Sequence, residues 1–131
     1  MTITHVTLLS IPVSDQERAR DFYVNTLGFD LLEDEPMGPG QRWVQVAPKG
    51  ALMSITLVTW FDSMPPGSLR GLMLDTDDLD GDIATLTERG VRFEGDIQQQ
   101  HWGRFVTFTD PDGNGLILRS ALEAGPRSAT G

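Results

Sequence analysis

Two histidines supply the only imidazole groups of this 131-residue chain, His5 and His101. Imidazole changes its charge near neutral pH, so either side chain can act as a general acid or base. His5 lies near the start of a predicted strand, and His101 lies in a polar loop beside Trp102. Each also has a plainer role open to it. His5 can be a hydrogen-bonded strand-end residue, and His101 can belong to the surface or rim.

The rest of the sequence lacks the common catalytic signatures. The absence of cysteine excludes disulfides, thiolate metal ligands and cysteine nucleophiles. The only lysine, Lys49, lies in a predicted turn, and it is the one candidate for a Schiff base. No G-x-S-x-G, H-E-x-x-H, Walker A or G-x-G-x-x-G motif occurs. Asp110 and Asp112 form a carboxylate pair, for which we favour a turn-forming role over acid–base chemistry.

The charge balance excludes several classes of partner. The chain has 10 basic and 19 acidic residues, which gives a net charge of −9. This charge repels phosphate backbones and argues against a polybasic membrane contact, so we expect no nucleic-acid and no membrane partner. No apolar run reaches the length of a membrane span, about 18 residues, and no signal pattern opens the chain, so we expect a cytoplasmic location. The excess negative charge either maintains solubility or attracts a cationic ligand.

Hydrophobic patterns and turn residues divide the chain into short strands and two helices. Residues 3–13 predict a strand, and Ser14–Glu17 form a capping box that opens a helix ending at Gly28. A second helix is predicted from Thr76 to Gly90. The other predicted strands are 29–32, 42–47, 51–59, 69–75, 91–94, 103–109 and 115–120, with a turn at 37–40.

This order of elements occurs twice along the chain. Equivalent residues are separated by a nearly constant number of positions. The offset is 62 from Asp15 to Asp77 and from Gly28 to Gly90, and 63 from Pro48 to Pro111 and from Gly50 to Gly113. Such a repeat indicates an internal duplication. We therefore predict an α+β fold with two tandem βαβββ modules in a single domain, residues 1–121. The modules cover about 3–60 and about 69–120, residues 61–68 link them, and 122–131 form a flexible tail.

A combination of short motifs runs from about residue 3 to residue 120. They are Pro12–Asp15, Phe22-Tyr23 with Leu27–Phe29, Thr76–Leu79, and Asp110–Asn114. Together these motifs resemble the vicinal oxygen chelate superfamily, which includes glyoxalase I, extradiol dioxygenases and bleomycin-resistance proteins. The resemblance implies a curled, open-barrel sheet around a central cup that holds the ligand. It also implies a homodimer and, in many members, a metal ion in the cup.

The metal-dependent members of that superfamily carry four His or Glu ligands, two from each module. His5 matches the first position. The other positions fall on Ser54 or Thr56, on Gly71 or Leu72, and on Ile117. Hydroxyl and aliphatic side chains do not hold a catalytic divalent ion tightly. We therefore expect no cofactor, and we disfavour a divalent metal site.

Side-chain alternation along the predicted strands gives a lining for the cup. The predicted inward residues are His5, Thr7, Trp43, Gln45, Ser54, Thr56, Met73, Phe108, Ile117 and Arg119. Residues of the opposite parity, such as Leu8 and Leu116, would pack under the helices. Trp43 and Trp102 either stack on a planar ligand or pack in the ordinary way. Arg119 either pairs with a ligand carboxylate or ends its strand.

Two functional hypotheses follow. The favoured one is a metal-free small-molecule-binding protein of the glyoxalase/bleomycin-resistance type, whose ligand is aromatic or cationic. Trp43, Ser54, Thr56, Met73, Trp102, Phe108, Ile117 and Arg119 would bind that ligand. The alternative is a lyase-like or dioxygenase-like enzyme that uses His5 or His101 as acid or base, or a weak, degenerate metal site.

Overall fold

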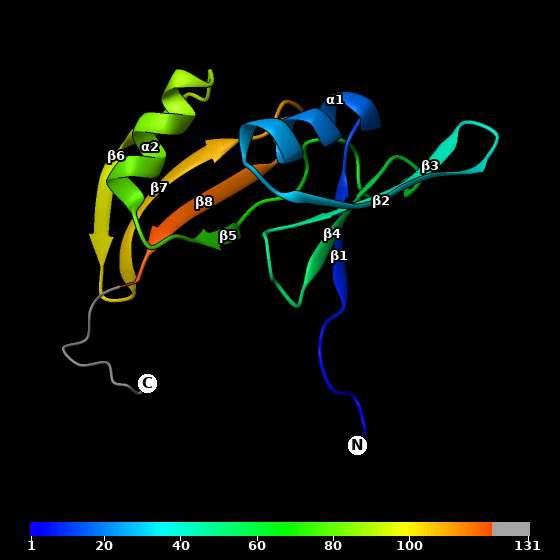
Figure 1. Cartoon of the computed structure of the whole chain (residues 1–131), viewed down its shortest axis with the longest axis horizontal. Coiled ribbons are helices and arrows are strands. Elements are labelled where there is room, and N and C mark those ends of the chain that lie inside the picture. The colour runs from blue at the N-terminus through cyan, green and yellow to red at the C-terminus, as the bar shows by residue number, and fades with distance from the viewer. Residues whose placement is uncertain (122–131) are drawn as a thin grey trace. The chain divides into compact units, whose positions relative to one another are not determined.

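The computed structural model describes residues 1–121, so the tail predicted at 122–131 lies outside the described residues (Figure 1). The first module contains β1 (Leu8–Pro12), α1 (Gln16–Asp21), the π-helical turn η1 (Phe22–Thr26), β2 (Asp30–Gly38), β3 (Gln41–Ala47) and β4 (Ser54–Val58). The second contains β5 (Leu72–Asp75), α2 (Leu79–Glu88), β6 (Phe93–Gln100), β7 (Gly103–Thr109) and β8 (Gly115–Ser120). This order confirms the predicted α+β fold of two βαβββ modules.

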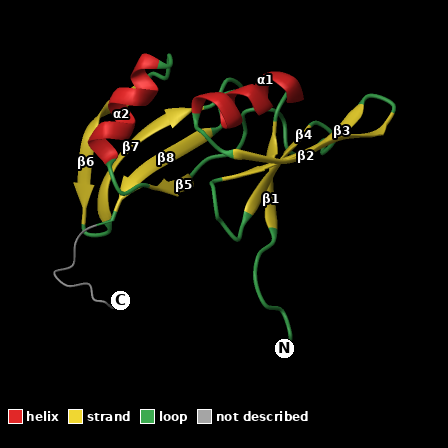
Figure 2. Ribbon diagram, viewed as in Figure 1, coloured by secondary structure: helices red, strands yellow, loops and turns green. Residues whose placement is uncertain are grey.

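Each module forms its own four-stranded sheet (Figure 2). The strand orders are β1-β4-β3-β2 and β5-β8-β7-β6, so the two sheets have the same topology. In each sheet the first and last strands of the module pair in parallel, and the other neighbours are antiparallel. Both sheets have free edge strands, so neither closes on itself as a barrel. Within residues 1–121, no helix has the length and apolar character needed to cross a bilayer.

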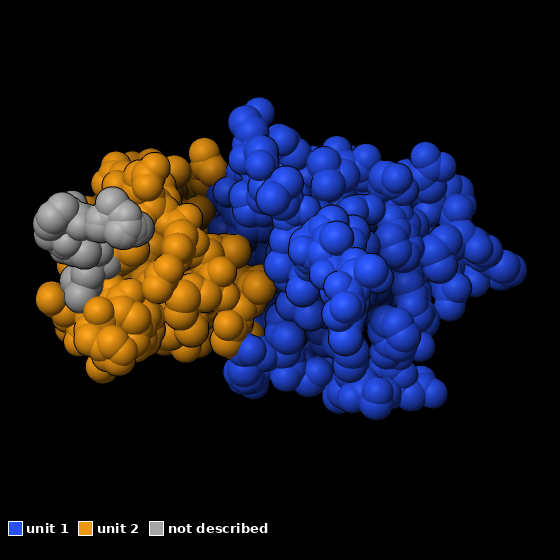
Figure 3. Space-filling model, turned by 90° about the horizontal axis from the view of Figure 1, so that it is seen from below, with its two compact units in different colours: residues 1–70, 110–114 blue, residues 71–109, 115–131 orange. Residues whose placement is uncertain are grey.

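The chain divides into two compact units, which Figure 3 colours separately. The first unit consists of residues 1–70 together with the loop 110–114, and the second consists of 71–109 and the chain from 115 onward. The division falls at 70/71, so the predicted linker, residues 61–68, belongs to the first unit. The loop 110–114 joins β7 to β8, yet its residues pack within the first unit.

The first helix begins one residue later than the capping box predicted. Asp15, rather than Ser14, is the N-cap, and its Oδ1 accepts hydrogen bonds of 3.1 Å from the amides of Glu17 and Arg18. Ser14 instead donates its hydroxyl to Asp112 Oδ1 at 2.6 Å. The helix then widens into η1, where the Leu27 amide donates to the Phe22 carbonyl. It ends at Gly28, whose φ of 80° suits a residue without a Cβ atom.

Several strand boundaries differ from the predictions. β4 begins at Ser54 instead of residue 51, and β5 begins at Leu72 instead of residue 69. β1 begins at Leu8 instead of residue 3, so His5 precedes the sheet. β2 continues to Gly38 through the predicted turn, and β6 continues to Gln100 through the predicted polar loop. Both extended strands are sheet edges, and both contain register shifts against their neighbours. Bulged edge strands tolerate proline, glycine and polar residues, which is why their composition resembled loops.

Candidate functional site

One face of the first sheet carries a row of neutral polar side chains. Ser10 pairs with Thr56, and Thr56 pairs with Gln45. Paired residues project on the same side of a sheet, so β1, β4 and β3 each contribute one member of the row. Trp43 and Ser54 lie two residues from Gln45 and Thr56, and therefore share this face. The register thus brings together three predicted ligand-binding residues, Trp43, Ser54 and Thr56.

Hydrogen bonds hold these side chains in two groups. The Trp43 indole Nε1 donates to Gln45 Oε1 at 3.0 Å, and Gln45 Nε2 donates to Ser54 Oγ at 2.7 Å. The Ser10 and Thr56 hydroxyls lie 3.0 Å apart. Ser54 and Thr56 are buried, whereas Trp43 and Gln45 are half-buried. We call these five residues, Ser10, Trp43, Gln45, Ser54 and Thr56, the polar row.

The face predicted for the first strand is wrong by one residue. Leu8 pairs with Ser54 and Ser10 with Thr56, so the even-numbered residues of β1 share the face of the polar row. Leu9 pairs with Ile55 on the opposite face. The prediction had placed His5 and Thr7, which have odd numbers, on the face of Ser54. A one-residue error in register moves every side chain of a strand to the other face, and parity alone does not fix the register.

His5 lies outside the polar row. It is exposed in the segment before β1, where its Nδ1 is 2.9 Å from the Thr4 hydroxyl. His101 is exposed in the turn between β6 and β7, beside Trp102. The two histidines belong to different compact units. Within residues 1–121, neither imidazole is hydrogen-bonded to the polar row, so their catalytic roles stay predictions.

The second sheet carries a different group of side chains on one face. Met73 pairs with Ile117, and Asp75 pairs with Arg119. Arg119 also pairs with Phe105, whose ring stacks on Trp102 with a centroid distance of 4.6 Å and an interplanar angle of 26°. Four predicted ligand-binding residues, Met73, Trp102, Ile117 and Arg119, are therefore held by this sheet and its β6–β7 turn.

Arg119 already forms hydrogen bonds with other residues of the protein. Its Nε and Nη2 donate to the two carboxylate oxygens of Asp75 at 2.7 and 2.6 Å, and its Nη1 donates to the Trp102 carbonyl at 3.0 Å. The hydrogen bonds to Asp75 raise the pKa of Arg119 above its ordinary value. A ligand carboxylate would have to displace Asp75, which the sequence reasoning missed because the pair is 44 residues apart.

Phe108 faces away from the other residues predicted with it. It pairs with Leu116, whereas Ile117 pairs with Thr107. Phe108 is buried and lies 5.4 Å from the Phe93 ring, centroid to centroid, in an edge-to-face arrangement. The prediction that Phe108 shares a face with Ile117 is therefore wrong. Phe108 belongs to the hydrophobic core, which also contains Leu116 and Leu118.

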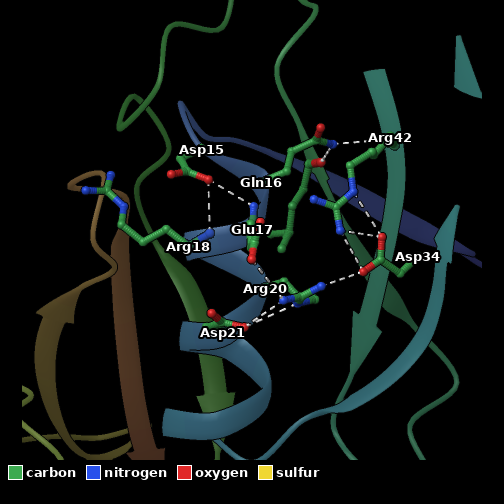
Figure 4. Close-up of polar contacts among 9 residues, drawn as sticks. Asp15, Gln16, Glu17, Arg18, Arg20, Asp21, Asp34 and Arg42 are labelled. Carbon is green, nitrogen blue, oxygen red and sulfur yellow. Dashed lines mark hydrogen bonds and ion pairs between the residues drawn. The ribbon is translucent and has the colours of Figure 1, made fainter. Parts of the chain in front are cut away.

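Charged groups hold α1 against the opposite face of the first sheet (Figure 4). Arg20 from α1 donates to Asp34 of β2 at 2.8 Å, and Arg42 of β3 donates to the same carboxylate at 2.7 Å. These hydrogen bonds, the one from Arg20 first, lower the pKa of Asp34. Gln16 adds hydrogen bonds to the carbonyls of Arg42 and Leu57. This anchoring supports the strands whose other face carries the polar row.

A second buried group joins η1 to the loop 110–114. The Tyr23 hydroxyl donates to Asp110 Oδ2 at 2.9 Å, and Asn114 Nδ2 donates to the same oxygen at 2.8 Å. Asp110 Oδ1 accepts the amides of Asp112 and Asn114. Burial, followed by the charge of Asp110, raises the pKa of Tyr23. All four Asp110 contacts are structural, which agrees with a turn-forming role for this carboxylate.

The residues at the superfamily's metal positions do not fit a divalent ion. Ser54 Oγ is engaged by Gln45 and by the Thr7 carbonyl, and Ile117 and Leu72 offer no donor atom. His5 stands alone as an imidazole before β1. Throughout residues 1–121, no three His, Cys, Asp or Glu side chains gather as a metal site would require.

Comparisons with known proteins agree with this fold. The family model of the Glyoxalase/Bleomycin resistance protein/Dioxygenase superfamily matches residues 2–118. The crystal structure of TnmS3, an antibiotic binding protein from Streptomyces sp. CB03234, is 59% identical with a TM-score of 0.87, and the match covers 93% of this chain and 99% of that one.

Two further relatives support the same assignment. A superfamily member from Sphaerobacter thermophilus DSM 20745 is 42% identical with a TM-score of 0.83, and the match covers 92% of this chain and 99% of that one. The uncharacterized protein YetH of Bacillus subtilis (strain 168) is 36% identical over 120 residues, which are 89% of this chain and 98% of YetH. The chain therefore belongs to the glyoxalase/bleomycin resistance protein/dioxygenase superfamily.

Proposed function

We propose that this protein binds and sequesters a small antibiotic-like molecule, without a metal ion and without converting it. The observation that carries the proposal is the 59% identity, over 93% of this chain, with an antibiotic binding protein. That identity, with a TM-score of 0.87, means that the two chains have closely similar folds. The nature of the antibiotic is a separate question, which the residues of each face address.

The polar row has the composition of a binding surface. It combines one large ring, Trp43, with an amide and three hydroxyls, and ligand pockets commonly pair aromatic walls with a few directed polar groups. None of its five side chains exchanges a proton near neutral pH, which favours binding over acid–base chemistry. On the second sheet, the Trp102–Phe105 stack supplies a second aromatic surface, with the half-buried Ile117 on the same face.

The acidic charge bears on which ligands are accepted. Glu33 pairs with Gln45, and Glu35 pairs with Trp43, so both carboxylates lie on the face of the polar row. Both are exposed, and neither has an ion-pair partner among the residues that the structure describes. With a net charge of −9, this face disfavours anions and tolerates neutral or cationic aromatic ligands.

Titration calorimetry on the purified full chain tests the proposal. Bleomycin, doxorubicin and chloramphenicol provide a cationic peptide, a cationic planar ring system and a neutral aromatic amide. We expect at least one to bind with micromolar or better affinity, to be recovered unchanged by mass spectrometry, and to bind equally after dialysis against EDTA. Trp43→Leu should weaken this binding, whereas Trp60→Leu, which lies after β4 and outside both sheets, should not.

Three results would contradict the proposal. Chemical conversion of a bound compound would support the enzyme hypothesis instead. Loss of binding after EDTA treatment, with recovery on adding a divalent ion, would show that a metal is needed. Equal effects of Trp43→Leu and Trp60→Leu would remove the polar row from the binding surface.

A further inference from the structure

The amide of Gln45 has only one orientation compatible with its neighbours. The oxygen and nitrogen of a glutamine amide are usually hard to distinguish, and their assignment depends on the surrounding hydrogen bonds. An indole N–H can only donate, so the atom 3.0 Å from Trp43 Nε1 must be the acceptor Oε1. Gln45 Nε2 consequently faces Ser54 Oγ at 2.7 Å. Trp43 therefore determines the polarity of the amide.

This orientation leaves hydrogen-bond donors on the face of the polar row. Nε2 carries two hydrogens, and within the described part of the chain Ser54 is its one partner. Ser10 and Thr56 bring two hydroxyl hydrogens to a single shared contact, so one of these hydrogens also stays available. Gln45 lies opposite Thr56 on the neighbouring strand, and adjacent strands are about 4.8 Å apart. The row thus presents the amide donor of the half-buried Gln45, whereas the Thr56 hydroxyl beside it is buried.

The charge on the same face selects among acceptors. A carboxylate accepts hydrogen bonds well, but Glu33 and Glu35 lie opposite Gln45 and Trp43 and would repel it. A carbonyl oxygen of an uncharged ring meets the same donors without that repulsion. Trp43 lies two residues from Gln45 on the same side of β3, so a ring held by Gln45 also reaches the indole.

We propose that Gln45 is the specificity-determining residue of this face, because its amide donates to a carbonyl oxygen of an uncharged planar ligand that lies against Trp43. This inference rests on the proposed function, since it names the class of ligand that the polar row accepts. It also assigns Trp43 and Ser54 a positioning role, because they hold the amide in the donating orientation.

Two probes of nearly the same shape isolate this hydrogen bond. In 9-fluorenone a carbonyl replaces the methylene group of fluorene, and neither probe carries a charge or a donor. We expect the wild-type chain to prefer 9-fluorenone by about tenfold, the size of one directed hydrogen bond. Binding is measured by quenching of tryptophan emission and by ligand-observed NMR. Gln45→Met keeps the length of the side chain but has no amide hydrogen to donate, and should abolish the preference for 9-fluorenone over fluorene.

Gln45→Glu adds a readout that a merely structural role would not give. At neutral pH its carboxylate still accepts from Trp43 but has no hydrogen to donate, so the preference for 9-fluorenone should disappear. The preference should return as the carboxyl group is protonated, which for an ordinary glutamate happens at about pH 4.3. Gln99→Met changes an exposed glutamine of β6, paired with Arg104, to the same residue as Gln45→Met, and should match the wild type throughout.

Equal affinity of the wild-type chain for the two probes, including no measurable binding of either, would overturn the inference. A tenfold preference that survives in Gln45→Met would overturn it as well, as would a Gln45→Glu variant whose preference does not depend on pH. The proposed function fails separately, because it is judged by the antibiotics and not by the two fluorene probes. Circular dichroism of each variant checks that the chain is folded.

Discussion

Tyr23 shows how one buried residue couples a helix to a distant turn. It is the only tyrosine of the chain, it is fully buried, and its hydroxyl donates to Asp110 Oδ2. Asp110 in turn holds the amides of Asp112 and Asn114. A phenol in this position serves as a hydrogen-bond donor, and ionisation would place a second negative charge beside the carboxylate. The residue therefore stabilises the fold only while it is protonated.

The first prediction concerns alkaline stability. Because the pKa of Tyr23 is raised in the folded chain, the folded state retains a proton that the unfolded state loses near its ordinary pKa of about 10. Its contribution is complete below that pH and is lost as the pH rises further. We expect the phenolate absorbance, which reports Tyr23 alone, to appear only together with unfolding.

Tyr23→Phe provides the matched comparison. It keeps the ring contacts with Phe22 and Phe29 but removes the hydroxyl, and should cost about 1–2 kcal/mol at neutral pH. Above pH 10 the stability of the variant should fall less steeply than that of the wild type, as measured by urea unfolding. A phenolate signal that appears while the chain is still folded would contradict this account.

Among the elements, the first helix depends on the ion pairs beneath it. Asp34 accepts from both Arg20 and Arg42, and its side chain is 17% exposed. Asp21, on the same helix, pairs with Arg20 at 3.1 Å but is 53% exposed. Exposed ion pairs contribute little because solvent screens them. Asp34 and Asp21 both pair with Arg20 but differ in exposure, so a comparison of the two tests how much burial adds to the stabilising effect of an ion pair.

The second prediction compares Asp34→Asn with Asp21→Asn. The lowered pKa of Asp34 means that its stabilising effect is present above the pKa of the unfolded chain, about 3.9, and is lost as the pH falls through the folded value. At pH 7 we expect Asp34→Asn to cost about 1–2 kcal/mol and Asp21→Asn under about 0.5 kcal/mol. The difference in the free energy of unfolding between wild type and Asp34→Asn, measured with urea, should shrink below about pH 4.

Two outcomes would contradict this prediction. One is an equal cost for the two substitutions at pH 7, because burial would then make no difference. The other is a cost of Asp34→Asn that does not decrease in acid. Either result would mean that α1 is held by the uncharged contacts of Gln16 instead.

The elements also show what the sequence could and could not predict. Gly28, with its positive φ, ends the first helical segment as predicted, and the repeated spacing identified both modules. Edge strands β2 and β6 were shortened in the prediction because their bulges contain residues typical of loops. Such features are local, so composition reveals the helix ends but misrepresents irregular strands.

The candidate site was harder to predict than the fold. Trp43, Ser54 and Thr56 were placed on one face correctly, because β3 and β4 are regular and adjacent. Phe108 and the residues of the first strand were assigned to the wrong face, because parity does not give the register between strands. The Asp75–Arg119 pair depends on two strands that are distant in sequence. Ser10 was not predicted as a member of the polar row because the sequence does not reveal how β1 pairs with β4.

At the scale of the whole molecule, the loop 110–114 links the two modules. It joins two strands of the second unit but packs within the first, so the chain passes between the units three times. Gly67, in the linker, lies against this loop: its amide donates to the Pro12 carbonyl, which also accepts from Asn114 Nδ2. The linker, β1 and the loop therefore meet at one carbonyl group.

The third prediction tests this junction with Gly67→Ala against Gly50→Ala. Both glycines have a positive φ, 83° and 77°, so alanine is strained at either position by about 1–2 kcal/mol. A Cβ atom at Gly67 would also collide with the backbone carbonyl of Asp112, whereas nothing lies within 4 Å of a Cβ atom at Gly50. Backbone cannot move aside as cheaply as a flexible side chain.

We therefore expect Gly67→Ala to cost about 1–3 kcal/mol more than Gly50→Ala in urea unfolding at neutral pH. A Gly67→Ala chain that does not fold while Gly50→Ala does would agree with the same reasoning. Equal losses for the two variants would mean that only the backbone conformation matters and that contact with the loop contributes nothing. Since the loop belongs to the same compact unit as the polar row, the junction also bears on the proposed ligand binding. If the loop supports the strands of that unit, Gly67→Ala should also weaken ligand binding more than Gly50→Ala does.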